Sequence, residues 1–170
     1  MTKILVVEDE TDLEILIKQK FRKKIWEQEY EFVFAINGLH ALEHLKKHAD
    51  VDIVLSNINM PEMDGLTLLT KLSEQHGILK SVIISAYGDM ENIRTAMNRG
   101  VFDFITKPVD SQDLELTLGK TIKQVKQIRA TLKAVKKNNI LKMILEKQLP
   151  FSKVNEGIYP IRSKLKTTVM

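Results

Sequence analysis

Five short apolar segments recur along the first 110 residues, and a helical pattern separates each from the next. The segments are rich in Val, Ile, Leu and Phe, which is typical of strands buried on both faces of a sheet. They span residues 3–7, 31–36, 52–55, 81–85 and 101–105. This alternation predicts an α/β fold, a doubly wound parallel sheet of five strands with helices on both faces.

The segments between the strands have apolar residues at helical spacing. Leu13, Ile17 and Phe21 share one stripe of the first, 12–24, which has acidic residues early and basic residues late, as the helix dipole favours. Shorter helices are expected at 38–48, 66–75 and 89–99. A fifth helix is expected from an N-cap near Ser111 until Pro150 ends it.

The later part of this fifth helix has the pattern of a coiled coil. Alternating steps of three and four separate Val125, Ile128, Leu132, Val135 and Asn139, as in an a/d seam. The pattern falters at Lys142, and the helix could instead pack on its own domain. We expect a core domain at 1–110, a coiled-coil linker at 111–149, and a tail or the start of a further domain at 150–170.

Charge is divided unevenly along the chain. Residues 1–110 contain 13 Lys and Arg against 18 Asp and Glu, whereas residues 111–170 contain 13 against 4. A basic segment could make the protein a DNA-binding regulator. However, the residues after the helix are too few for a winged-helix or helix-turn-helix domain. A solvated helix face is the simpler interpretation, and we do not expect nucleic acid as a partner.

The composition excludes several classes of protein. The sequence has no Cys, which excludes disulfides, thiolate zinc sites and cysteine nucleophiles. No apolar run reaches the roughly 18–20 residues of a membrane span, and Met1 leads directly into an apolar strand-like segment. We therefore expect a cytoplasmic protein without a membrane partner.

Polar side chains follow the predicted strands at their carboxyl ends. Glu8 and Asp9 follow the first strand, Asn57 ends the third, Ser85 closes the fourth, and Lys107 follows the fifth. In an open parallel sheet, ligands bind beyond the carboxyl ends, where the strand order reverses; for the order 2-1-3-4-5 this point lies between the first and third strands. Oxygen ligands at such an open site suit Mg²⁺. A hydroxyl with an ammonium suits a phosphoryl group.

These segments together resemble the receiver domain of response regulators in two-component signalling. The resemblance covers essentially all of residues 1–110 and implies a flavodoxin-like sheet of order 2-1-3-4-5 without enzymatic activity. Its partner would be a histidine kinase or phosphotransfer protein. An output enzyme could follow in a longer protein. The matching strings are Ile4-Leu-Val-Val-Glu-Asp-Glu10, Ala35-Ile-Asn-Gly-Leu-His-Ala-Leu42, Asp52-Ile-Val-Leu-Ser-Asn-Ile-Asn-Met-Pro-Glu-Met-Asp-Gly65 and Phe102-Asp-Phe-Ile-Thr-Lys-Pro108.

The resemblance implies a magnesium site around the first and third strands. Glu8 and Asp9 would form its acidic pocket, with Asp9 as the more direct ligand. The backbone carbonyl of Asn59 and the side chain of residue 57 would complete the protein ligands.

It also implies how the site would bind phosphate and switch. Ser85 and Lys107 would bind the phosphoryl oxygens, and Ser85 and Phe104 would occupy the switch positions. A cis peptide bond would precede Pro108.

The chain departs from the receiver pattern at residue 57, where Asn replaces the phosphate-accepting Asp. The neutral amide is a poor nucleophile and a weaker metal ligand than a carboxylate. Either Asn57 is an engineered replacement that locks a phosphorylation-dependent switch off, or the protein is a natural pseudo-receiver. The retention of Ser85 and Lys107 favours the first. In that case the switch would relay its state to an output domain through helix-mediated dimerisation.

Overall fold

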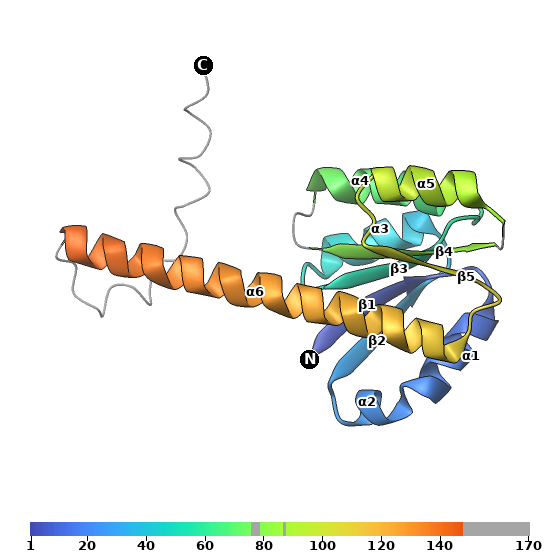
Figure 1. Ribbon diagram of the computed structural model, residues 1–170, viewed down its shortest axis with the longest axis horizontal. Helices are drawn as coiled ribbons and strands as arrows, with labels where there is room; N and C mark the ends of the chain where they lie inside the picture. Colours follow the sequence, from blue (N-terminus) through green and yellow to red (C-terminus); the bar gives the residue numbers. More distant parts are fainter. Residues whose placement is uncertain (76–78, 87, 148–170) are drawn as a thin grey trace, which may run out of the picture. The chain divides into compact units, whose positions relative to one another are not determined.

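The computed structural model describes residues 1–75, 79–86 and 88–147 (Figure 1). Five parallel strands form one sheet in the order β2-β1-β3-β4-β5, which confirms the predicted fold class and strand order. The strands are β1 (Thr2–Val7), β2 (Tyr30–Ala35), β3 (Ile53–Asn57), β4 (Lys80–Ala86) and β5 (Asp103–Lys107). The third strand ends at Asn57, as expected for that polar residue, and pairs with β4 up to it.

Six helices connect and flank the strands in the described part of the chain. They are α1 (Thr11–Lys20), α2 (Arg22–Trp26), α3 (Gly38–Lys47), α4 (Gly65–Gln75), α5 (Met90–Asn98) and α6 (Ser111–Lys147). The prediction of a single helix at 12–24 is therefore wrong, because the helix is interrupted at Phe21, between α1 and α2. This buried ring packs against Tyr30 and Phe32, with ring centroids 5.9 and 5.5 Å apart.

Successive residues of the strands point to opposite faces of the sheet, and each face has its own core. Ile4 and Val6 pack in the cluster formed with α1 and the first part of α6. Leu5 and Val7 pack with α3 and α4 on the other face, where α5 also lies (Figure 1). This two-sided packing exposes the strand ends as the place for a site.

Helix α6 is capped by Asp110 and not by the predicted Ser111. The Asp110 Oδ1 atom accepts hydrogen bonds from the backbone N–H groups of Gln112 and Asp113, at 2.8 and 3.1 Å. Those two bonds hold the pKa of Asp110 below its ordinary value. Ser111 is the first helical residue.

The chain divides into two compact units, Met1–Lys126 and Gln127–Met170. The first unit includes the beginning of α6, because Leu118 and Val125 are buried in the core against the sheet. The boundary expected at residue 110 thus lies inside this unit. Val125, predicted to begin a coiled-coil seam, is instead a core residue with 1% exposure.

Within the second unit, α6 continues to Lys147. Its apolar residues are more exposed: Ile128 is half-buried, while Leu132 and Val135 are 37% and 48% exposed. The predicted helix end at Pro150 and the tail expected at 150–170 lie outside the described residues, as do the side chains from residue 140 on. No helix within the described ranges combines the length and hydropathy needed to cross a membrane.

Candidate functional site

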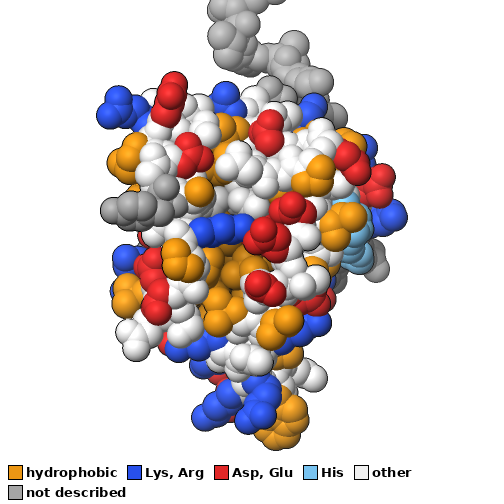
Figure 2. Space-filling model, turned by 90° about the vertical axis from the view of Figure 1, so that its right-hand side faces the viewer, with side chains coloured by type: hydrophobic (Ala, Val, Ile, Leu, Met, Phe, Trp, Pro, Cys, Tyr) orange, Lys and Arg blue, Asp and Glu red, His pale blue; other side chains and the backbone are white. Residues whose placement is uncertain are grey.

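Glu8, Asp9 and Asn57 come together because β1 and β3 are neighbours in the sheet. Val7 pairs with Ser56, so Glu8 and Asn57 emerge side by side at the carboxyl edge. Figure 2 views the molecule from this edge and shows acidic side chains beside a basic one, above a hollow with a hydrophobic floor. The residues that line this hollow are Glu8, Glu10, Asp12, Leu13, Leu16, Lys107, Pro108 and Val109.

Asn57 is the centre of the hydrogen bonds at this edge, and it is buried with 6% exposure. Its amide nitrogen Nδ2 donates to Glu8 Oε1 at 2.8 Å, to the Asn59 carbonyl at 3.0 Å and to Asp9 Oδ1 at 3.3 Å. Its Oδ1 accepts from the Asn59 backbone N–H at 3.3 Å. The predicted ligand residues thus surround a single atom of Asn57.

The loop after β3 is fixed by close backbone contacts. Gly65 packs so tightly that a Cβ atom there would lie 2.2 Å from the carbonyl oxygen of Asn57, so only glycine fits. The Gly65 N–H donates to the Ile58 carbonyl at 2.8 Å. Asp64 then caps α4 by accepting from the Thr67 N–H at 2.7 Å. These contacts position residue 57 through its backbone.

Lys107, at the end of β5, forms ion pairs with Glu8 and Glu10, which follow β1. Its Nζ lies 3.1 Å from Glu8 Oε2 and 3.3 Å from Glu10 Oε2. Burial raises the pKa of Glu8, and the ammonium of Lys107 opposes that rise. For Lys107, burial lowers the pKa, but Glu8 and Glu10 outweigh it and the pKa is raised. The peptide bond before Pro108 is cis, as the resemblance implied.

Ser85 and Phe104 lie apart from this network. Ser85 is fully buried, and its hydroxyl donates to Asp89 Oδ2 at 3.1 Å; the same oxygen accepts from Asn92. Phe104, on the edge strand β5, is 36% exposed. Within the described residues, no hydrogen bond links Ser85 to Asn57 or Lys107.

Two acidic residues contact the predicted site residues but were not predicted as part of the site. Glu10 was given no role, although its carboxylate pairs with Lys107. Asp89 had been placed at the start of a helix, although its carboxylate accepts from Ser85. The signal available for Asp89 was its spacing of four residues from Ser85.

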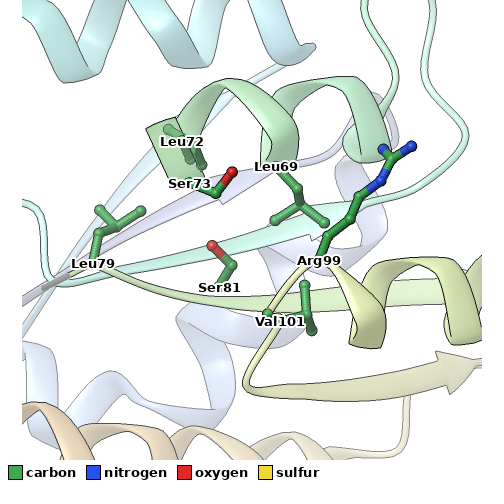
Figure 3. A pocket seen from close by; sticks show the side chains of 8 residues that line it. Leu69, Leu72, Ser73, Leu79, Ser81, Arg99 and Val101 are labelled. Atoms are coloured by element: carbon green, nitrogen blue, oxygen red, sulfur yellow. The ribbon is translucent and has the colours of Figure 1, made fainter. Parts of the chain in front are cut away.

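A second hollow lies at the opposite, amino edge of the sheet, between α4 and the start of β4 (Figure 3). Its walls are Leu69, Leu72, Ser73, Leu79, Ser81, Arg99, Gly100 and Val101. The Arg99 guanidinium donates to the Leu66 carbonyl and the Thr70 hydroxyl, both at 2.9 Å. Its charge therefore helps to join α5 to α4, and none of the predicted site residues lines this hollow.

The oxygen atoms around Asn57 fit Mg²⁺ in kind. Two carboxylates and a backbone carbonyl are hard donors, and Mg²⁺ keeps several waters beside such a set. Oε2 of Glu8 is also buried without a hydrogen bond, although it forms the ion pair with Lys107. Within the described residues, no group of three or more His, Asp or Glu side chains could hold a metal ion. The point on which the oxygens converge is occupied by Nδ2 of Asn57.

A family model for the response regulator receiver domain matches residues 4–119. The chain belongs to this family. It is 32% identical over 120 residues to the chemotaxis protein CheY of Bacillus subtilis, covering 71% of this chain and 97% of CheY. Among solved structures, a response regulator receiver domain protein from Clostridium thermocellum superimposes with a TM-score of 0.67 at 26% identity, covering 75% of this chain and 99% of that one.

Other relatives are much longer than this chain. The regulatory protein AtoC of Escherichia coli is 31% identical over 122 residues, which are 72% of this chain but 25% of AtoC. The chain therefore spans about a quarter of that relative and nearly all of CheY. Residues 4–119 therefore form a receiver domain of the two-component response regulator family, the class of domain that interacts with histidine kinases or phosphotransfer proteins and generally binds Mg²⁺ at its phosphorylation site.

Proposed function

We propose that this receiver is a phosphorylation-dependent switch whose acceptor position is residue 57, blocked here by Asn57. The observation that carries the proposal is the convergence of Glu8, Asp9 and the Asn59 carbonyl on that one side chain. A receiver needs a carboxylate oxygen there to attack the phosphoryl group of a histidine kinase or phosphotransfer protein. Asn57 has the required shape but not the charge.

The remaining residues have clear tasks in this proposal. Glu8, Asp9, residue 57 and the Asn59 carbonyl would hold Mg²⁺, which neutralises charge on a phosphoryl group when bound. Lys107 would provide a fixed positive charge beside the phosphoryl oxygens.

The switch itself would use Ser85 and Phe104. The Ser85 hydroxyl would turn from Asp89 to the phosphoryl group. Phe104, at the other switch position on β5, would change its side-chain orientation when Ser85 does so.

The state of the switch would reach an output domain through α6. Leu132 and Val135 are exposed at helical spacing in its second unit, and Asn139 continues the same seam. A parallel coiled coil of two such helices would cover these residues, and a polar core residue such as Asn139 fixes register. We therefore propose a homodimer through residues from Gln127 onward.

The test restores the missing carboxylate. Asn57→Asp should accept phosphate from acetyl phosphate with Mg²⁺, whereas the chain with Asn57 should not, because only a carboxylate forms an acyl phosphate. The phosphorylated fraction is measured by intact mass and by its lability to hydroxylamine. Asn57→Ala is the matched control, since it also lacks a nucleophile. If Asn57→Asp folds and stays unmodified, the pseudo-receiver interpretation replaces this one.

A further inference from the structure

We infer that the amide of Asn57 takes the place of the metal ion: its NH₂ group holds the three ligand oxygens together and so excludes Mg²⁺ from the pocket. The inference rests on the proposed function only for the identity of the ligand oxygens. In this inference Asn57 fills the metal position itself. It is not simply a weaker metal ligand than a carboxylate.

Three ligand oxygens are arranged around one atom, Nδ2 of Asn57. The Glu8, Asp9 and Asn59 oxygens lie 2.8, 3.3 and 3.0 Å from this one atom. A cation bound by these three oxygens would lie among them, in the space that Nδ2 fills, and the oxygens would move inward to contacts of about 2.0–2.1 Å for Mg²⁺. The amide and the ion therefore compete for one position.

The orientation of the Asn57 amide is determined by its hydrogen-bond neighbours. Oδ1 of Asn57 faces a donor, the Asn59 N–H, while Nδ2 faces three acceptors. Rotating the amide by half a turn would place an oxygen against those acceptors and an NH₂ group against the Asn59 N–H. Every one of the four contacts would become repulsive, so Asn57 cannot offer its oxygen to a metal without losing them.

The side chain at position 57 also sets the net charge of the pocket. With Asp at position 57, three carboxylates would share the site with Lys107, and a cation would be needed to relieve their repulsion. Asn57 removes one negative charge and adds two N–H donors at the centre. Glu8 and Asp9 are then held together without a metal, because hydrogen bonds to charged acceptors are among the stronger ones.

The test compares Mg²⁺ affinity in three forms of the full chain by calorimetric titration with MgCl₂. If Asn57 were simply a poor ligand, the order of affinity would be Asp, then Asn, then Ala, which offers no ligand. Because the amide blocks the position, we expect the order Asp, then Ala, then Asn. The Ala form should bind Mg²⁺ roughly tenfold more tightly than the Asn form, because Mg²⁺ must break the hydrogen bonds of the Asn57 amide to the carboxylates before it can bind. An Ala form that binds Mg²⁺ as weakly as Asn, or more weakly, overturns the inference.

A second readout uses thermal unfolding with EDTA or with Mg²⁺. The chain with Asn57 should show the same midpoint in both, whereas Asn57→Asp should be lower in EDTA and recover with Mg²⁺. A midpoint of the Asn57 chain that rises with Mg²⁺ as much as that of Asn57→Asp contradicts the inference. Should Asn57→Ala fail to fold, Asn57→Ser takes its place in the affinity order. Phosphorylation of Asn57→Asp is a separate result, so the proposed function can hold while this inference fails.

Discussion

Helix α6 passes without a break through two different environments. Up to Lys126 one stripe of its apolar side chains belongs to the receiver core: Leu114, Leu118, Ile122 and Val125 are buried there. From Gln127 onward the same steps of three and four continue, but Leu132 and Val135 are well exposed. The spacing thus determines which side chains share one stripe of the helix. What covers that stripe depends on whether a sheet lies against it.

The largest expected difference between the two regions is in stability. Leu118→Ala should lower the free energy of unfolding by about 2–5 kcal/mol, because it leaves a cavity in a close-packed core. Leu132→Ala, the matched change one region further along, should cost less than about 0.5 kcal/mol in the monomer. Urea unfolding at low protein concentration measures both. Equal losses would mean that Leu132 is buried in the same fold.

Self-association should depend on the second region of α6, from Gln127 onward, and not on the first. Leu132→Asp should weaken self-association at least about tenfold, because a charge would enter the apolar seam. Thr131→Asp is the control, since it places the same charge on the adjacent, exposed position. Sedimentation at several concentrations gives both dissociation constants. Truncation after Lys126 should give a folded monomer, and a truncated receiver that still dimerises fully would place the interface on the domain.

The truncation is placed after Lys126 because the residues of α6 before that point belong to the receiver core. A cut after Lys120 would remove Ile122 and Val125, which are 4% and 1% exposed in the receiver core. Loss of association in such a fragment could then reflect unfolding.

Salt provides a further check on the same interface. Lys133, Lys136 and Lys137 lie exposed along the second part of α6, and few acidic residues are available to pair with them. Their repulsion opposes association and should be screened by salt, so dimerisation should strengthen as ionic strength rises. Weaker association in salt would indicate an interface held by ion pairs.

The smallest expected effect lies in the first part of α6. Gly119 is an exposed interior helical residue, and a Cβ atom there would meet no other atom within 4 Å. Gly119→Ala should therefore raise the free energy of unfolding by about 0.5–1 kcal/mol, because Ala loses less backbone entropy on folding. Gly65→Ala is the opposite control, since its Cβ would collide with the Asn57 carbonyl. A neutral Gly119→Ala would mean that this turn of the helix is already frayed.

The sheet and its order could be predicted because buried strands and helical stripes leave direct patterns in the sequence. The pattern could not locate the break at Phe21, whose ring packs against two rings of β2, Tyr30 and Phe32. Nor could it separate Val125 from Leu132, because both occupy seam positions of one repeat. These differences depend on tertiary packing, which periodicity does not contain.

The candidate site could be predicted as far as topology decides it. Neighbouring parallel strands end at one edge, and this places Glu8 beside Asn57. The direction of each hydrogen bond depends on rotamers, so the pairing of Lys107 with Glu10 and of Ser85 with Asp89 was missed. The roles assigned to these residues in phosphate and metal binding stay predictions until the proposed variants are measured.

The close contact between Gly65 and the Asn57 carbonyl has an evolutionary consequence. The loop is fitted to the backbone of residue 57, and this contact does not involve its side chain. A single base change interconverts Asn and Asp codons, so a chain with Asn57 stands one mutation from a carboxylate at this position without any rebuilding of the loop. A lineage can therefore exchange these two side chains in either direction, because the loop is fitted to the backbone that both residues share.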